Sequence, residues 1–449
     1  MQQLRRLFSR LMSTTTRTRS PSPSTPQSDD APLSKRPRLS TPPTTTTTTT
    51  REEEVVVYDL PYSVGMHLAP MVRIGTLPMR LLSLEYGASI VWGPEIVDKA
   101  IIGSTRTVNS KTGVISFMKN NRSVFECHPL EKSRLIFQLG SADPSLAVDA
   151  LKVVEKDVGG VGLNCGCPKS FSLQGGMGAA LLKEPEKLCN ILKALVKSTS
   201  LPIDAKIRLL PLPSPSPSTS EEDPTLPLIK KILSTGINCL TVHCRTQTMR
   251  SSEPALHSRL LSINKSLSLA RATASTEEDW MKVPVVCNGD VIGGDSTTST
   301  TEGDVWGNFN KVCKETRVTS VMIARGAESN PSCFNSQGVE DLIKVVIPRL
   351  LRIAILTNNH YSNTKYILNA LNLHNSPTPP CKELNREIKL KMNKAKNYFE
   401  MGEIFGLSRE EVERLEKEGD ERELEEMVPR WKERREVIEK ESRREKNTK

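Results

Sequence analysis

Between residue 66 and about residue 335, short apolar runs alternate with stretches of helical periodicity. The runs are rich in Val, Ile and Leu and are apolar throughout, which predicts parallel strands buried on both faces. We expect eight strands, at 67–72, 88–95, 134–140, 160–166, 201–208, 239–245, 284–290 and 320–326. Helical intervals that can serve as crossovers lie at 77–87, 144–156, 184–197 and 226–236.

Eight strand–helix units in about 265 residues match the size of a (β/α)8 barrel. The sequence therefore predicts an α/β protein with a TIM barrel over 61–335, and a doubly wound open sheet is the main alternative. Two stretches rich in Pro, Ser, Thr and acidic residues, near 209–224 and 292–304, read as loop insertions.

The segments on either side of the barrel have a different composition. Residues 1–60 form a basic tail rich in Ser, Thr and Pro, for which we expect disorder. Its Arg- and Ser-rich start fits either a mitochondrial presequence or a solvated basic tail, and "SKRPRLS" at 34–40 fits a nuclear import patch. Residues 336–449 predict a C-terminal helical domain that ends in a charged helical tail.

Composition narrows the class of protein. The 449 residues carry 62 Lys and Arg against 52 Asp and Glu, a formal charge of +10, which is compatible with a polyanionic partner. Ten scattered cysteines without a secretory signal predict reduced thiols. Because no apolar run approaches the ~18 residues of a membrane span, we expect no membrane association. The expectation is a monomer in the cytoplasm or the nucleus, with the mitochondrion as an alternative.

Each predicted strand ends on a residue that can donate a hydrogen bond, accept one or carry charge. In a TIM barrel, function resides at the carboxyl ends of the strands, so these residues predict one shared site. The strand-end residues are Pro70, Met71, Glu95, Gln138, Asn164, Cys167, Lys206, His243, Asn288, Gly289, Asp290 and Arg325.

The last two strands carry the usual phosphate-binding corner of such a barrel. "CNGD" at 287–290 and "ARGA" at 324–327 supply small residues and a cation for a phosphate group. Gln138 can pair with a flavin or pyrimidine edge, and Lys206 and His243 can face an electron-rich heterocycle. Together they indicate a phosphorylated planar cofactor, whereas no GxGxxG follows the first strand to suggest a dinucleotide-binding unit.

The pair Cys165 and Cys167 precedes Pro168 and a glycine-rich run. We predict no metal there, because a zinc site needs about four ligands and none with suitable spacing is nearby. A redox pair usually has C-x-x-C spacing. Cys165 therefore reads as a small buried residue, and Cys167 as a nucleophile or a general acid above the barrel mouth.

Several motifs in order resemble the tRNA-dihydrouridine synthases, most of all the eukaryotic branch that acts on position 20 in the D-loop. The resemblance covers about residues 66–370. It is carried by "LAPMVRIGTLPMRLLSLEYGA" (68–88), "NCGCPKSFSLQGGMGAALL" (164–182), "KIR" (206–208), "VHCR" (242–245), "NGD" (288–290), "ARGAESNPS" (324–332) and "HYSNTKY" (360–366). Two departures are Cys165 in place of the usual Met and "HCR" in place of the more frequent "HGR".

The resemblance implies an FMN enzyme that NADPH or NADH reduces and that converts a uridine of tRNA to 5,6-dihydrouridine. It implies that hydride reaches C6 and that Cys167 protonates C5, with the base flipped into the pocket. It places the cofactor at Pro70, Met71, Val72, Gln138, Lys206, His243, Asn288, Gly289, Asp290, Ala324 and Arg325. It places the substrate at Glu95, Asn164, Arg73, Lys169, Arg208 and Arg245.

The helical region would then supply phosphate contacts for tRNA, with candidates at Lys365, Arg386, Lys389, Lys391, Lys394 and Lys396. Two alternatives stay open. One is a flavin TIM-barrel oxidoreductase acting on a free pyrimidine, and the other is a non-catalytic RNA-binding protein that retains the fold.

Overall fold

The computed structural model describes residues 59–213, 222–273, 282–293 and 307–428. All of these residues belong to one compact unit that spans 53–449. Residues 1–58 of the predicted N-terminal tail, half of the predicted insertion at 209–224, most of that at 292–304 and the end of the charged C-terminal tail lie outside the described residues.

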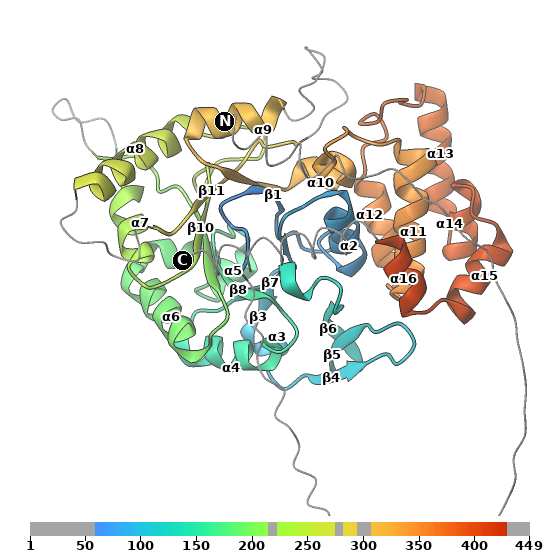
Figure 1. The fold of residues 1–449 in the computed structure, drawn as a ribbon, viewed down its shortest axis with the longest axis horizontal. Helices are drawn as coiled ribbons and strands as arrows, with labels where there is room; N and C mark the ends of the chain where they lie inside the picture. Colours follow the sequence, from blue (N-terminus) through green and yellow to red (C-terminus); the bar gives the residue numbers. More distant parts are fainter. Residues whose placement is uncertain (1–58, 214–221, 274–281, 294–306, 429–449) are drawn as a thin grey trace, which may run out of the picture. The chain divides into compact units, whose positions relative to one another are not determined.

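Eight parallel strands close into a barrel, as the sequence predicts, and do not form the doubly wound open sheet that was the alternative (Figure 1). Each strand pairs with its neighbours in the ring, and β1 closes the ring by pairing with both β2 and β12. The strands are β1 (Gly65–Leu68), β2 (Val91–Trp92), β7 (Leu135–Gly140), β8 (Gly160–Cys165), β9 (Ile203–Arg208), β10 (Cys239–His243), β11 (Val285–Asn288) and β12 (Ser320–Ile323).

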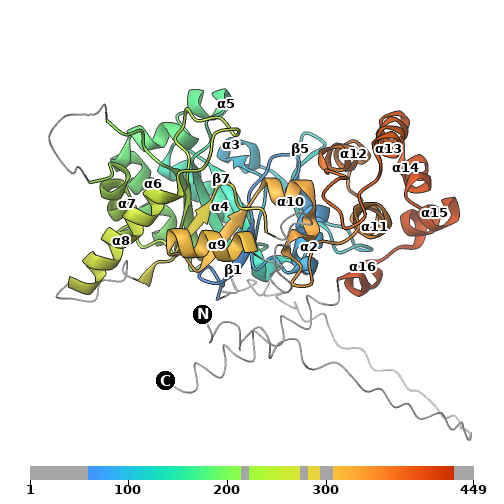
Figure 2. The ribbon, with the colours of Figure 1, turned by 90° about the horizontal axis from the view of Figure 1, so that it is seen from above.

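The apolar runs form barrel strands because both of their faces are covered. All six residues of β8 are buried, and so are all four of β12. Helices surround the ring on its outer side in both views (Figures 1 and 2). These helices are α2 (Leu77–Tyr86), α4 (Pro144–Val154), α6 (Pro185–Ser198), α7 (Thr225–Leu233), α8 (His257–Thr273), α9 (Gly307–Thr316) and α10 (Arg325–Ser329).

Local sequence sets the helix starts. At α4, the Asp143 side chain accepts hydrogen bonds from the backbone N–H groups of Ser145 and Leu146, both at 2.9 Å, and Pro144 occupies the first turn. Helices α8 and α9 were not among the predicted helical intervals. Both contain few apolar residues, as in "HSRLLSINKSLSLARAT" for α8, so their helical periodicity is weak in the sequence. In α8 the buried side is formed by Leu260, Ile263 and Leu267.

A buried carboxyl group lies inside the barrel. Asp204 on β9 accepts hydrogen bonds from the Trp92 indole at 3.3 Å and the Tyr62 hydroxyl at 3.4 Å. Burial raises its pKa from 3.8 to about 7, although these two donors act in the opposite direction. The group is therefore largely protonated in weakly acidic solution.

A three-stranded antiparallel sheet between β2 and β7 is the main element that the sequence does not predict. It consists of β4 (Thr105–Val108), β5 (Ile115–Lys119) and β6 (Arg122–Cys127), after the short β3 (Ile96–Val97) and α3 (Asp98–Ile101). Phe125 of β6 packs edge-on against Phe137 of β7, with ring centroids 5.0 Å apart. The sheet is thereby attached to the barrel wall.

An ion pair in the protein interior joins α2 to the segment after β6. Arg80 of α2 is 1% exposed and donates hydrogen bonds to both oxygens of Glu131, at 2.8 and 2.7 Å. The guanidinium also donates to the carbonyls of Gly75 and Glu126, each at 2.7 Å. All three guanidinium nitrogens therefore contribute to the attachment of α2.

The chain after the barrel is helical. The π-helical turn η5 (Leu342–Val346) leads into α11 (Ile347–Leu356), α12 (Tyr361–Ala370), α13 (Lys382–Lys394), α14 (Tyr398–Ile404), α15 (Arg409–Glu418) and α16 (Glu421–Met427). Arg349 of α11 contacts Glu85 of α2 at 3.2 Å, and Asn363 of α12 donates to the carbonyl of Arg73 at 2.7 Å. Whether residues 336–449 act as a separate domain stays a prediction. None of the helices in the described ranges combines the length and hydropathy that a membrane crossing requires.

Candidate active site

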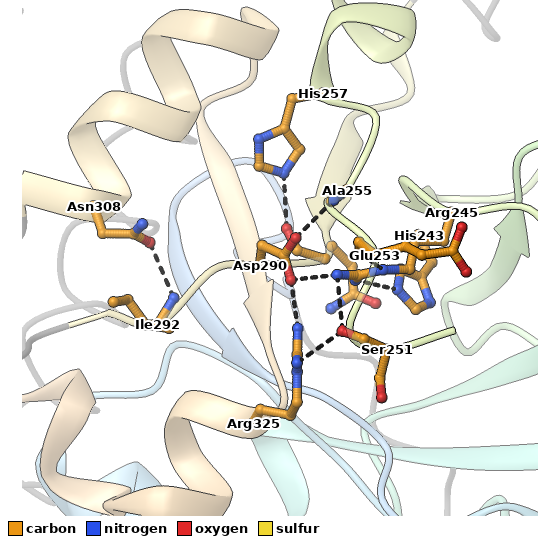
Figure 3. A network of polar contacts seen from close by, with 12 residues as sticks. His243, Arg245, Ser251, Glu253, Ala255, His257, Asp290, Ile292, Asn308 and Arg325 are labelled. Carbon is orange, nitrogen blue, oxygen red and sulfur yellow. Dashed lines mark hydrogen bonds and ion pairs between the residues drawn. The ribbon is translucent and has the colours of Figure 1, made fainter. Parts of the chain in front are cut away.

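A cavity of about 670 Å³ opens at the carboxyl ends of β9 to β12. Eight of the predicted site residues line it: Arg208, His243, Arg245, Asn288, Gly289, Asp290, Ala324 and Arg325. The predicted phosphate corner therefore borders a real cavity, and Figure 3 shows its polar network.

Asp290, the first residue after Gly289, is at the centre of this network. Its backbone has a φ of +52°, a left-handed conformation that Asp tolerates better than most residues. One carboxylate oxygen accepts from the guanidinium of Arg245 at 2.5 Å and from that of Arg325, while the other accepts from the backbone N–H of Ala255 at 2.6 Å. Asp290 thereby orients two cations at the cavity wall.

The two arginines differ in how much of each guanidinium remains available. Arg245 is 3% exposed and also donates to the carbonyls of Glu253 at 2.8 Å and Ser251 at 3.3 Å. Arg325 is half exposed and donates to the carbonyl of Ser251 at 3.0 Å. Arg325 can therefore reach a ligand in the cavity, whereas Arg245 mainly fixes the loop that follows β10.

His243 at the end of β10 lies among cations. Its Nε2 is 3.4 Å from Nη1 of Arg245. Burial lowers the pKa of His243 most, and the positive charges of Lys206, Arg208, Arg245 and Arg325 lower it further. The imidazole is neutral at physiological pH and can accept or donate one hydrogen bond to a ligand.

The side chain of Lys206 on β9 has no hydrogen bond or ion pair with another residue in the described ranges. Burial lowers its pKa from 10.5 to about 7, and the neighbouring charge of Arg208 adds to this effect. Arg208 itself donates to the carbonyls of Gly166 and Thr246, both at 2.9 Å. Lys206 is thus a cation without a counter-ion at the carboxyl end of the barrel.

The predicted catalytic segment follows β8. The side-chain oxygen of Asn164 accepts hydrogen bonds from the backbone N–H groups of Gly166 and Cys167, each at 3.0 Å. The Asn164 amide also donates to Gln138 Oε1 at 3.4 Å. Cys165 is fully buried, whereas Cys167 is partly exposed. Only the second thiol of the pair is placed to meet a substrate.

The glycine-rich run packs closely beneath Cys167. Gly178 has a φ of +57°, and a Cβ at this position would lie 2.4 Å from Ser172 Oγ and 2.7 Å from the carbonyl oxygen of Cys167. The N–H of Ala179 donates to that same carbonyl at 3.0 Å. These contacts fix the backbone of Cys167.

A carboxyl group faces the thiol. Glu95 interacts with Cys167, Asn164 and Ser172, the last at 3.5 Å. Burial raises the pKa of Glu95 above its usual value. Burial also raises the pKa of Cys167, and the charge of Glu95 contributes in the same direction. Cys167 therefore keeps its proton at neutral pH, as a proton donor requires.

The structure brings most of the predicted site residues to one end of the barrel. Lys206 connects the two clusters, because it pairs in register with Asn164 on one side and Thr241 on the other, and its charge interacts with Cys167. Pro70 and Met71 follow β1 and are half-buried. Val72 and Lys169 are exposed, and neither lines the cavity.

Arg73 lies at the boundary with the C-terminal helices. Its guanidinium stacks over Tyr366 of α12, 4.7 Å from the ring centroid, and its backbone has a φ of +68°. The motif at 360–366 therefore contacts the loop after β1 and does not line the cavity.

Several cavity residues were missed by the sequence reasoning. They come from the loop after β10, from the segment after β11, from α10 and from the turn after α12, and none of them is a polar residue at a predicted strand end. They include Met249, Ser251, Val291, Ile292, Gly326, Ser329, Asn372, His374 and Asn375. A buried side-chain oxygen of Asn375 has no hydrogen-bond partner within the described residues.

These side chains fit a phosphorylated aromatic ligand. The cavity combines a half-exposed arginine with a neutral histidine, and a partly buried lysine whose side chain has no partner lies on the adjoining strand. An anion placed among them would offset the desolvation of Lys206, and the polar amides could pair with a heterocycle.

Comparison with known proteins identifies the family. A family model described as Dihydrouridine synthase (Dus) matches residues 67–417. The tRNA-dihydrouridine(20) synthase [NAD(P)+] of Schizosaccharomyces pombe is 45% identical over 321 residues, covering 70% of this chain and 60% of the relative. The enzyme of the same name from Saccharomyces cerevisiae is 37% identical over 326 residues, covering 69% of this chain and 77% of the relative.

A third relative, the tRNA-dihydrouridine(20a/20b) synthase [NAD(P)+] of Schizosaccharomyces pombe, is 31% identical over 269 residues, covering 59% of this chain and 67% of the relative. The chain spans only 60% of the length of the first of these relatives. The family model covers more than half of the chain and includes the barrel and most of the described C-terminal helices. The chain belongs to the dihydrouridine synthase family.

Proposed function

We propose that this protein reduces a uridine of tRNA to 5,6-dihydrouridine, at position 20 in the D-loop. The observation that carries the proposal is the placement of a protonated, partly exposed Cys167 at the same barrel end as a cavity lined by cations and amides. Two of the relatives bear the name of this activity at position 20, which supports the choice of position.

The proposed cofactor is FMN, with NADPH or NADH as the reductant. Its phosphate end would lie where the ends of β11 and β12 line the cavity, held by Arg325, Asn288, Gly289, Asp290 and Ala324. Its ring system would be surrounded by Lys206, His243, Gln138, Pro70, Met71 and Val72. When bound, FMN supplies the hydride for C6 of the uracil.

Cys167 would donate the proton to C5. A raised thiol pKa keeps this proton in place until the substrate carbanion forms, and Asn164 fixes the backbone that carries the thiol. The transfer leaves a thiolate, which solvent can reprotonate because the residue is partly exposed. Glu95 would orient the uracil, since its carboxyl oxygens lie beside the thiol.

The tRNA would approach this end of the barrel with the target base flipped out. Arg73, Lys169 and Arg208 are the proposed contacts to RNA or to the uracil, and Arg245 would act by holding Asp290. Two of the predicted helical contacts also donate hydrogen bonds within the protein. Lys365 donates to the carbonyls of Asn393 and Ala395, and Lys389 donates to those of Asn369 and Leu371.

The experiment is the reduction of an unmodified tRNA transcript by the purified chain with NADPH, followed by mapping of dihydrouridine. We expect dihydrouridine at position 20 with the wild type and none with Cys167→Ala, while Cys165→Ala remains active as the matched control. Free uracil, orotate and uridine monophosphate are tested in parallel. Turnover of a free pyrimidine without turnover of tRNA would favour the small-molecule oxidoreductase, and binding of tRNA by a protein that never holds flavin would favour the non-catalytic alternative.

A further inference from the structure

A second group of reactive side chains lies behind the cavity wall. Cys244 follows β10, Cys287 is on β11 and His257 begins α8. Their ligand atoms, two sulfurs and one ring nitrogen, all lie within 4.8 Å of one another. Both cysteines are fully buried, and the His257 side chain is 16% exposed. The proposed reduction of uridine uses none of them.

We propose that Cys244, Cys287 and His257 bind a divalent zinc ion that fixes the phosphate corner of the barrel. The two sulfurs are 3.7 Å apart. Two thiolates on one tetrahedral zinc ion, with Zn–S bonds of about 2.3 Å, lie about 3.8 Å apart, so the backbone already sets this spacing. The three ligands come from three different elements, which is why a search for C-x2-C spacing in the sequence does not find them.

The histidine is oriented as metal-bound histidines usually are. Its Nε2 donates to the carbonyl of Gly289 at 2.7 Å, so Nδ1 is the ring nitrogen that would bind the metal. A ligating imidazole almost always donates its other N–H to a carbonyl or a carboxylate. The acceptor here is the glycine directly before Asp290, so the ion would be linked to the cavity through one hydrogen bond.

The fourth position has a candidate in Glu315 of α9. One of its carboxylate oxygens is 3.8 Å from Nδ1 of His257, and its side chain is 45% exposed. A carboxylate or a water molecule could therefore complete a tetrahedral site from the solvent side.

Charge balance also favours zinc. Two thiolates and a neutral imidazole form an uncharged group with a divalent cation, which can be buried at little cost, whereas two thiolates alone cannot. Binding releases the two thiol protons to solvent. Soft sulfur with nitrogen favours zinc over magnesium or calcium.

The test is the metal content of the purified full-length chain, produced with added zinc and passed over a chelating resin. We expect about one zinc ion per chain in the wild type and about tenfold less in Cys244→Ser, Cys287→Ser and His257→Asn. Cys239→Ser is the matched control, since Cys239 is equally buried on the same strand β10 but outside the trio. It should retain the metal.

A second measurement does not depend on any variant. Titration of the zinc-free wild type with cobalt(II) should give the intense visible bands of a tetrahedral ion and a thiolate-to-cobalt charge-transfer band. Zinc should then displace the cobalt and abolish both. Wild-type protein without bound metal, retention of zinc by the trio variants, or loss of the two thiols to a disulfide would each overturn the proposal.

Discussion

Replacement of Lys206 by Met should have opposite effects on the stability of the flavin-free protein and on its affinity for flavin. Lys206 lies at the barrel end without an anionic partner, and burial lowers its pKa from 10.5 to about 7. This change corresponds to at most about 5 kcal/mol of unfavourable free energy for the charged form. Because part of the side chain still reaches solvent, we expect a penalty of about 2 kcal/mol.

The sign follows from the protons bound in each state. Between about pH 7 and pH 10.5 the unfolded chain keeps the Lys206 proton and the folded chain releases it, so the stability of the wild type rises with pH across this window. The methionine cannot titrate. Lys206→Met should therefore be more stable than the wild type near pH 7 by about 2 kcal/mol, and this difference should shrink toward pH 10.5.

FMN should reverse the order of the two proteins. An anionic cofactor would give the ammonium group its partner, and a hydrogen bond to a charged group contributes about 1.5–3 kcal/mol. Lys206→Met should accordingly bind FMN about 10- to 100-fold more weakly. The assays are urea unfolding of the flavin-free proteins from pH 6 to pH 10 and a flavin fluorescence titration. Lys169→Met, which removes an exposed lysine near the site, should change neither quantity. A variant that is destabilised at pH 7 and binds FMN normally would refute the reasoning.

Three further perturbations test the packing. Asp204→Asn should raise the free energy of unfolding by about 2 kcal/mol above pH 7 and leave it unchanged near pH 4. The reason is that the raised pKa of Asp204 makes the wild type lose stability as the pH rises from 3.8 to about 7. Equal shifts in urea unfolding at both pH values would contradict this. Arg80→Met should lower the free energy of unfolding by about 3–5 kcal/mol, since it leaves Glu131 buried without a partner. Lys152→Met, at an exposed ion pair, should lower it by less than about 1 kcal/mol. Similar losses for the two variants in urea unfolding would contradict the account. Gly178→Ala should lower the rate of tRNA reduction about tenfold while flavin content is retained, because the new methyl group displaces the backbone of Cys167; an unchanged rate would show that this packing does not matter.

The barrel could be predicted because most of its strands are short, mainly apolar runs. Residues 160–165 and 320–323, for example, are buried throughout, and the local amino-acid composition of such segments indicates burial on both faces of the strand. The sheet at 105–127 could not be predicted in the same way. Its first strand is exposed at all four positions, and its attachment depends on Phe125, whose partner Phe137 is on another strand.

The site was predictable to the extent that it lies at strand ends. His243 and Asn288 each end a strand, and both line the cavity. The amides of Asn372 and Asn375 reach the same cavity only because the C-terminal helices pack against the barrel, which no local pattern reveals. Burial of Arg245 likewise depends on the loop at 251–255, which folds over its guanidinium.

The central claim is that Cys167 gives its proton to the uracil that the cofactor reduces. The most direct measurement is anaerobic stopped-flow of the flavin-loaded chain, first with NADPH and then with unmodified tRNA. The account predicts that NADPH reduces the flavin of the wild type and of Cys167→Ala at equal rates. It also predicts that tRNA reoxidises the flavin of the variant at least about 100-fold more slowly than that of the wild type. Reoxidation of Cys167→Ala by tRNA at the wild-type rate would contradict it.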